Sequence, residues 1–203
     1  MPITKASALA DAKPATLIIG SQGTGKSYAA INHVAHCDRV LWVNLRNLAG
    51  VTAYPEWDVS TPTSRTDFVE DVVKNAANYE AVVIDDLSGL KDVILPDGDV
   101  SQPMWLKMGR EIQTYFRLIK ARTGIFVCQC NTVTDESGTE YMAVNRDLAR
   151  RVTGFFDEIW YTSAQTTRSK KNGRVVNTGI ERSVETNKVA AINMLNIENT
   201  ETK

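Results

Sequence analysis

The sequence predicts an α/β fold: a mostly parallel sheet covered by helices, followed by a C-terminal antiparallel hairpin. Short apolar runs without alternation recur along the first two-thirds of the 203-residue chain, as expected for strands buried on both faces. Segments with helical spacing of apolar residues separate these runs, and this alternation is typical of parallel sheets. Near the C-terminus, Asn172-Gly173 suits a tight turn between two β-rich segments.

The apolar runs give four predicted strands: residues 15–20, 40–45, 81–84 and 125–130. Helices are predicted over residues 26–37, from 63 or 64 to about 76, over 103–122 and over 146–152. Thr63 or Ser64 can cap the second of these helices, and Pro103 suits the first position of the third. The polar or Pro-containing segments between these elements are expected to be loops: residues 46–62, 87–102 and 131–145.

The hairpin is predicted to join strands 158–162 and 174–184 through a basic turn. The chain length suggests one domain. We expect a loose N-terminal arm over residues 1–14, a core over 15–190 and a tail over 191–203.

Composition excludes several function classes. The chain has 23 Lys and Arg against 24 Asp and Glu, so its net charge of −1 gives no general attraction to nucleic acid or membranes. Three cysteines are too few for a disulfide scaffold, and the sequence shows no signal peptide. We therefore expect a cytoplasmic protein, in the host cytoplasm if it is phage-encoded. No apolar run is long enough to span a bilayer, so no membrane partner is expected.

The first motif with chemistry is residues 20–27, GSQGTGKS, which fits the phosphate-binding pattern G-x-x-x-x-G-K-[ST] in full. It lies between a predicted buried strand and a predicted helix. Glycines let backbone N–H groups face phosphate oxygens, and the helix dipole favours the same anion. We expect Lys26 to reach the β- and γ-phosphates of ATP and Ser27 to bind Mg²⁺. The predicted nucleotide-binding residues are Gly20, Ser21, Gln22, Gly23, Thr24, Gly25, Lys26, Ser27 and Tyr28.

The second motif is the apolar strand 81–84, which ends in two acids. Asp85 is the expected Mg²⁺ partner of Ser27, and Asp86 is a candidate to polarise the attacking water. A plain helix or loop cap is the alternative for Asp86. Gln129 or Asn131, at the end of the fourth strand, is a candidate sensor of the γ-phosphate, and the alternative is that both only begin a loop. The predicted catalytic residues are Lys26, Asp85, Asp86 and Asn131.

Cationic side chains suggest further contacts. Arginine-finger candidates are Arg146, Arg150, Arg151 and Arg168. A possible single-stranded DNA contact comprises Arg168, Lys170, Lys171 and Arg174, with Tyr141 in the 131–145 loop as a base-stacking candidate. A solvated turn is the alternative for the hairpin. Zinc binding by the histidines and cysteines lacks a recognised spacing.

With these motifs placed, the chain resembles the RecA-like branch of P-loop ATPases, and more narrowly short phage proteins with a RecA core that act in single-strand annealing. GSQGTGKS and VVIDD carry the specific part of this resemblance. It implies Mg²⁺-dependent ATP hydrolysis, homo-oligomers, single-stranded DNA, and single-strand-binding or other recombination proteins as partners. RecA proteins place a catalytic Glu just after the second strand, whereas VNLRNLAG contains no acid there.

Two alternatives remain open. One is a motor or assembly ATPase, for example in genome packaging. The other is a nucleotide-gated binding module with negligible hydrolysis, which the missing Glu permits. The Asp85-Asp86 pair also resembles AAA+ proteins, but a helical lid domain of that type is not evident in the sequence.

Overall fold

The protein is described by a computed structural model that covers residues 14–46, 51–95, 101–171 and 174–186, without the side chains of residues 167–179. Within these ranges the sheet has the strand order β3-β2-β4-β5-β1-β7-β8, and β6 pairs with β5. The strands are β1 (Ala15–Gly20), β2 (Val40–Asn44), β3 (Asp58–Ser60), β4 (Ala81–Asp85), β5 (Ile125–Thr134), β6 (Glu140–Met142), β7 (Glu158–Lys171) and β8 (Arg174–Thr186).

The pairs from β3 to β7 are parallel, whereas β8 is antiparallel to β7 and β6 to β5. The predicted fold class is therefore confirmed, including the C-terminal antiparallel hairpin. The α-helices are α1 (Lys26–Val34), α2 (Arg65–Asp67), α3 (Leu87–Ile94), α4 (Gln102–Lys120) and α5 (Arg146–Thr153). Shorter helical turns are η2 (Val51–Ala53), η3 (Phe68–Val73, a π-helix) and η4 (Ala76–Asn78).

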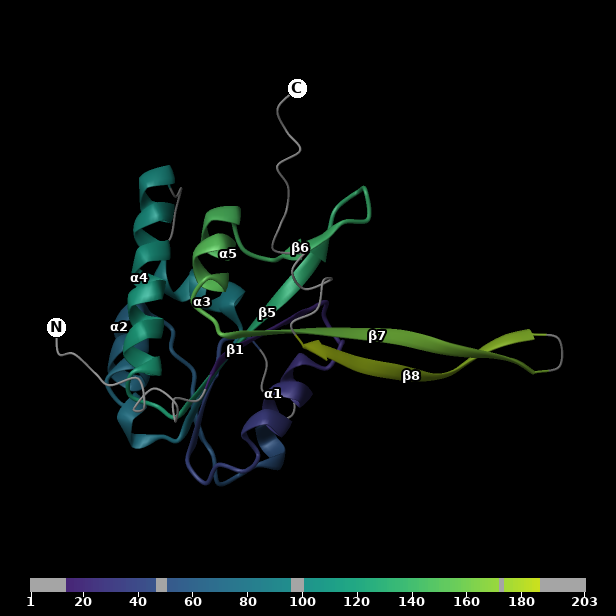
Figure 1. Ribbon diagram of the computed structural model, residues 1–203, viewed down its shortest axis with the longest axis horizontal. Helices are drawn as coiled ribbons and strands as arrows, with labels where there is room; N and C mark the ends of the chain where they lie inside the picture. The colour runs from purple at the N-terminus through teal and green to yellow at the C-terminus, as the bar shows by residue number, and fades with distance from the viewer. Residues whose placement is uncertain (1–13, 47–50, 96–100, 172–173, 187–203) are drawn as a thin grey trace.

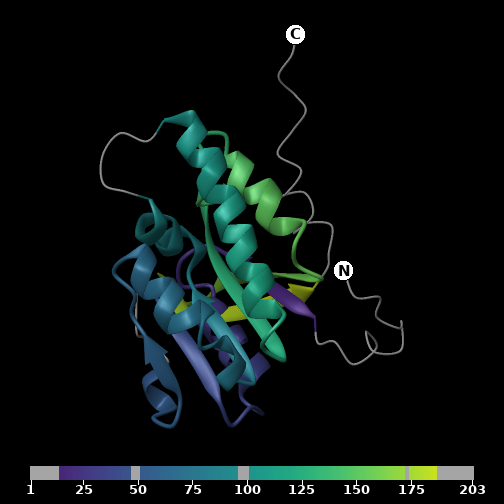
Figure 2. The ribbon, with the colours of Figure 1, turned by 90° about the vertical axis from the view of Figure 1, so that its left-hand side faces the viewer.

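Helices cover both faces of the sheet, α1 on one side and α3, α4 and α5 on the other (Figures 1 and 2). Alternate residues of the central strands pack into two separate cores. In β1, for example, Ile18 joins the α1 core, while Leu17 and Ile19 join the core under α4. Both strand faces are thus buried, which explains why these strands are continuous apolar runs.

The structure corrects the predicted loops. Segment 46–62 contains η2 and the edge strand β3, which pairs with β2. Segment 87–102 contains α3 and the first residue of α4. Segment 131–145 contains the end of β5 and the short strand β6.

Several element boundaries also differ from the predictions. The first helix ends at Val34, and the predicted second helix is a short α-turn followed by the π-helical turn η3. The first hairpin strand runs to Lys171 instead of Thr162, because its pairing continues beyond the β-rich segment. The second begins at Arg174 as predicted and ends at Thr186 instead of Val184. Most of the predicted N-terminal arm and all of the predicted tail lie outside the described residues.

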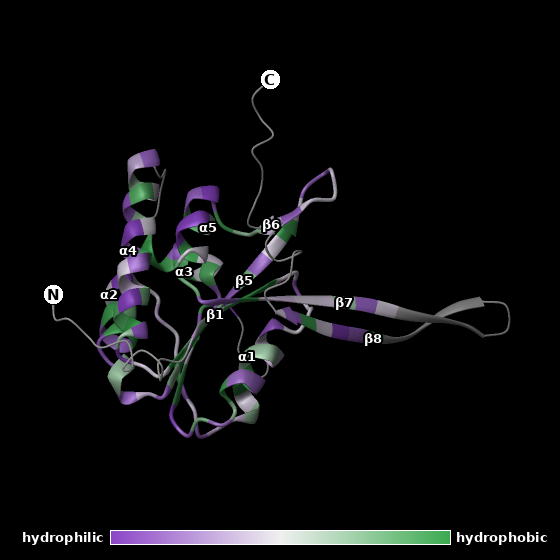
Figure 3. Ribbon diagram, in the orientation of Figure 1, coloured by the Kyte–Doolittle hydropathy of each residue, from purple (hydrophilic) through white to green (hydrophobic). Residues whose placement is uncertain are grey.

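The β7–β8 hairpin projects from the sheet as a long two-stranded ribbon (Figure 1). The helices carry both hydrophobic and hydrophilic bands (Figure 3), since each helix packs one face on the sheet. Over the described ranges, no helix combines the length and the apolar character needed to cross a bilayer.

Candidate functional site

The glycine-rich loop connects β1 to α1 with the backbone that its glycines permit. Gly23 and Gly25 have positive φ angles of 81° and 100°, which side-chain-bearing residues rarely adopt. Gly25 occupies the N-cap position of α1 and supplies no side-chain cap. The first N–H groups of α1 are therefore open to an anion, and the helix dipole favours one there.

Lys26 lies inside this loop. Its Nζ donates to the carbonyl oxygens of Gly20 and Ser21 at 2.9 and 2.8 Å. The side chain is 7% exposed, and burial lowers the pKa of Lys26, while the charges of Asp86 and Asp85 oppose this shift. The loop carbonyls thus hold the ammonium beside the start of α1. Phosphate oxygens bound there would be stronger hydrogen-bond acceptors for the ammonium than these carbonyls.

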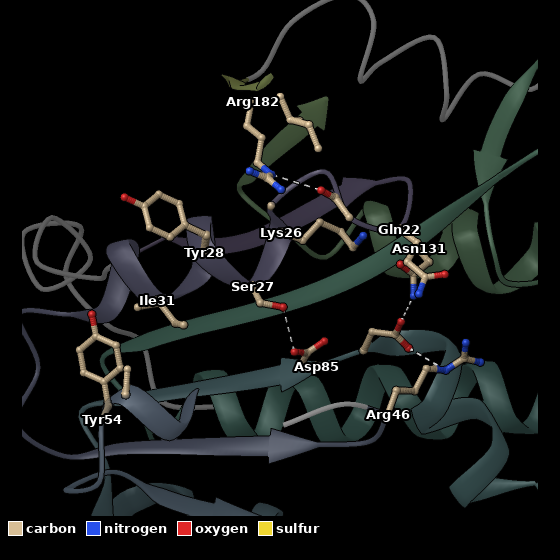
Figure 4. A pocket seen from close by; sticks show the side chains of 15 residues that line it. Gln22, Lys26, Ser27, Tyr28, Ile31, Arg46, Tyr54, Asp85, Asn131 and Arg182 are labelled. Carbon is tan, nitrogen blue, oxygen red and sulfur yellow. Dashed lines mark hydrogen bonds and ion pairs between the residues drawn. The ribbon is translucent and has the colours of Figure 1, made fainter. Parts of the chain in front are cut away.

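Ser27 meets the end of β4. Its Oγ lies 3.1 Å from Asp85 Oδ2 and 3.2 Å from Gln129 Oε1 (Figure 4). One hydroxyl proton serves one of these acceptors at a time. Three oxygen-bearing side chains from α1, β4 and β5 therefore converge beside the loop, and this donor chemistry suits Mg²⁺.

Two buried polar atoms near this cluster have no hydrogen-bond partner within the described structure: Asn44 Oδ1 and Gln129 Nε2. Asn44 is in register with Asp85 on the neighbouring strand, and Gln129 contacts Ser27. Buried polar groups normally have partners. Neither residue lines the cavity beside the loop, so the fit of this site to Mg²⁺ rests on the oxygens of Ser27 and Asp85.

Burial raises the pKa of Asp85 to about 6, with the hydrogen bond from Ser27 acting in the opposite direction. Between pH ~4 and ~6 the folded protein thus holds a proton that the unfolded chain has lost, so this group makes stability fall as pH rises through the window. Above that window the Asp85 carboxylate is charged in both the folded and the unfolded state. The whole free-energy cost of burying this charge then lowers the stability of the folded protein.

We therefore expect Asp85→Asn to stabilise the nucleotide-free protein at pH 8 by on the order of 2–3 kcal/mol, with a much smaller gain at pH 4. Urea denaturation at both pH values, with EDTA present, measures this difference. A gain that is equal at the two pH values would contradict the assignment.

Asp86 has a different environment. It is 2% exposed, and its Oδ1 caps α3 by accepting from Gly89 N at 2.9 Å and from Ser88 Oγ at 2.6 Å. Arg46 Nε lies 3.5 Å from the same oxygen, and Asn131 Nδ2 donates to Oδ2 (Figure 4). The capping alternative is therefore present in the structure, and the water-polarising role stays a prediction.

These residues line a cavity of about 920 Å³. Beyond the loop and the acids, its wall is largely apolar, with Tyr28 and Ile31 from α1, Ala53 and Tyr54 from the β2–β3 connection, and Ile180 from β8 (Figure 4). Tyr54 is held by stacking on Trp57, with ring centroids 4.2 Å apart. The cavity thus joins a cationic, metal-compatible end to an apolar end, which suits a ligand with a phosphate chain and an aromatic ring.

The structure brings most of the predicted site residues together. Gln22, Gly23, Gly25, Lys26, Ser27, Tyr28, Asp85, Asp86 and Asn131 line the cavity. Thr24 points elsewhere: its Oγ1 donates to Ser21 O at 2.8 Å and lies 2.7 Å from Thr162 Oγ1. Ser21 Oγ faces β5 and β6, where it contacts Thr132 and Glu140. The two side chains therefore fix the loop's shape.

Sequence reasoning missed four polar or aromatic contributors: Arg46, Tyr54, Glu140 and Arg182. None belongs to a local motif. Arg182 is separated from its contact Gly23 by 159 positions, so only strand pairing identifies it.

Other predicted residues are not part of this cavity. The arginine-finger candidates on α5, namely Arg146, Arg150 and Arg151, do not line it. The side chains of Arg168, Lys170, Lys171 and Arg174 lie outside the described residues. Cys37 belongs to the α1 core, whereas Cys128 and Cys130 belong to the other. Within the described part of the chain, no metal-binding group of histidine, cysteine and acidic residues occurs.

A parallel sheet, a glycine-rich loop leading into α1 and an acid at the end of β4 define the fold of the P-loop nucleoside triphosphatases. Comparison with solved structures agrees: flagellar accessory protein FlaH from Methanocaldococcus jannaschii superposes with a TM-score of 0.52 at 11% identity, over 92% of this chain and 86% of that one. The P4 protein from bacteriophage phi6, in complex with ADP, is a weaker match at 12% identity, with 84% and 58% coverage and a TM-score of 0.46. No family model and no curated protein sequence matches the chain.

Proposed function

We propose that this protein binds ATP with Mg²⁺ in the cavity at residues 20–27 and hydrolyses it as a RecA-like ATPase. The convergence of Lys26, Ser27 and Asp85 at the uncapped start of α1 carries this proposal. The helix N-terminus and Lys26 would hold the phosphates. Ser27 and Asp85 would hold Mg²⁺, which would neutralise charge on the phosphate oxygens.

The apolar end of the cavity supports a nucleoside ligand. Tyr28 is 69% exposed and adjoins Ser27 in the chain, while Tyr54 approaches from the β2–β3 connection. Aromatic faces stack readily on nucleobases. We therefore place the base between α1 and this connection.

Asp86 remains our candidate for polarising the attacking water, with Asn131 beside it as a γ-phosphate sensor. We expect Asp86→Asn to leave ATP affinity within about threefold of wild type while slowing turnover at least about 100-fold, because a base acts mainly in the transition state. Titration of ATP and steady-state turnover on the same samples separate the two effects. Wild-type turnover in this variant would place the base elsewhere.

The engagement of Asp86 by Ser88, Gly89, Arg46 and Asn131 also favours a second candidate: a nucleotide-gated binding module with negligible hydrolysis. The position beside Asp85 on β2 is Asn44, not an acid, so the resemblance to RecA supplies no other base. Tight ATP binding without turnover, with or without DNA, would favour this candidate.

We further propose that single-stranded DNA is the partner in recombination or annealing, contacted by the basic end of the β7–β8 hairpin. The hairpin projects from the sheet as a long ribbon (Figure 1). Arg168, Lys170 and Lys171 belong to the last residues of β7, and Arg174, the first residue of β8, pairs with Lys171. Clustered cations contact successive phosphates, and each contact adds about 0.7 to the salt slope of single-strand binding.

ATP turnover measured without DNA, with single-stranded DNA and with duplex DNA tests these proposals together. Stimulation by single-stranded DNA alone supports the recombination role. Stimulation only by duplex DNA or by a protein partner supports a motor or assembly ATPase instead. We also propose a homo-oligomer with nucleotide near a subunit boundary, so specific activity should rise with protein concentration.

A further inference from the structure

Arg182 reaches the glycine-rich loop from the C-terminal hairpin of the same chain. Its Nε donates to the carbonyl oxygen of Gly23 at 3.3 Å (Figure 4). Its Cδ lies 3.0 Å from the position that a Cβ on Gly25 would occupy. It lines the same cavity as Lys26 and Ser27, so a second cation stands at the phosphate end of the site.

Contacts between the base of the β7–β8 hairpin and the glycine-rich loop determine the position of Arg182. Thr162 of β7 is fully buried, and its Oγ1 donates to Ile19 O at 3.2 Å and lies 2.7 Å from Thr24 Oγ1. Thr162 pairs with Val184 of β8, and Ala164, two residues further along β7, pairs with Arg182. β7 also pairs in parallel with β1, the strand that leads into the loop. Arg182 is therefore carried by the strand pair that buttresses the loop.

The exposed guanidinium of Arg182 has no anionic partner among the described residues. Its hydrogen bond to the loop goes to an uncharged backbone carbonyl, that of Gly23. Arginine presents five donors in a planar fork that matches phosphate geometry. A phosphate oxygen is a much stronger acceptor for this group than a backbone carbonyl.

We propose that Arg182 binds the phosphates of a nucleotide held in its own chain's glycine-rich loop, exchanging the Gly23 carbonyl for phosphate oxygens. This inference rests on the proposed ATP site and adds a residue to it. The arginine acts in cis, in contrast to the finger from a neighbouring subunit that the resemblance implies.

Binding is tested by fluorescence titration of methylanthraniloyl-ATP with Mg²⁺ against wild type, Arg182→Ala, Arg182→Lys and the control Arg117→Ala. Arg117 is exposed on α4 and does not line the cavity. We expect Arg182→Ala to weaken binding about tenfold or more, Arg182→Lys to have an intermediate effect and the control to match wild type. Thermal melts without nucleotide check that all variants fold.

Wild-type affinity in Arg182→Ala overturns this inference and leaves the proposed ATP site standing. Failure of wild type itself to bind overturns the proposed function. The two failures are therefore distinguishable in one experiment.

Mixing separates action in cis from action in trans. Lys26→Ala and Arg182→Ala subunits are combined in equal amounts, and ATP turnover is compared with the sum of the separate samples. An arginine acting in trans would restore activity, because an intact loop would meet an intact Arg182 from its neighbour. We expect no restoration, and recovery of turnover would overturn the cis assignment.

Discussion

Lys26→Ala should reduce ATP turnover at least about 100- to 1,000-fold, because phosphoryl transfer depends on positioned charge and Lys26 is the buried cation of the loop. Its ammonium is already held inside the loop by Gly20 and Ser21, so little reorganisation is needed when phosphate arrives. Affinity for ATP should fall by about one to two orders of magnitude, the range for hydrogen bonds to charged groups.

Steady-state turnover and ATP titration measure both effects. Lys107→Ala is the matched control, because Lys107 is exposed on α4 and outside the cavity. Thermal melting distinguishes a lost charge from a lost fold. Equal turnover by wild type and Lys26→Ala would refute the proposed site.

Gly20→Ala should lower the free energy of unfolding by about 3 kcal/mol, at the upper end of the usual range for overpacking. A methyl group at Gly20 would lie 2.3 Å from Thr162 Oγ1 and 2.4 Å from Thr162 O. Thr162 is fully buried and belongs to β7, which is paired with β1. The clash involves backbone, so relief requires β1 and β7 to move apart.

Urea denaturation of wild type, Gly20→Ala and the control Gly154→Ala measures this effect. A Cβ at Gly154 would meet no atom closer than 3.7 Å, and the residue has a helical φ of −66°, so its replacement should be nearly neutral. A Gly20→Ala variant as stable as Gly154→Ala would mean that Thr162 of β7 can shift to admit a methyl group at Gly20 without a measurable loss of stability. Reduced ATP affinity should accompany the loss of stability, because Gly20 also accepts a hydrogen bond from Lys26.

Sequence signals that depend on near neighbours were sufficient for the central sheet. The apolar runs of β1, β2, β4 and β5 specify strands because both faces of each strand are buried. The loop motif and the acid that ends β4 predicted a shared edge, and the contact between Ser27 and Asp85 brings them together.

Sequence analysis missed α3 and β3, whose formation depends on contacts with residues distant in the sequence. In α3, Gly89 reads as a loop residue because glycine weakens helices. In the fold, a Cβ there would lie 2.7 Å from Leu45 Cβ, so close packing against the end of β2 requires the glycine. The edge strand β3 is three residues long and largely exposed, so it has no hydrophobic pattern to reveal it.

The sequence by itself determined the fold class, the phosphate-binding loop and the acid opposite it. Each of these features is encoded by residues that are adjacent in the chain, so a local pattern is enough to predict it. Only the tertiary structure decided which distant side chains complete the cavity. Arg46 and Tyr54 follow β2, and Arg182 arrives on the last described strand. Their positions depend on strand order and register, which arise from packing across the whole sheet and not from any local pattern.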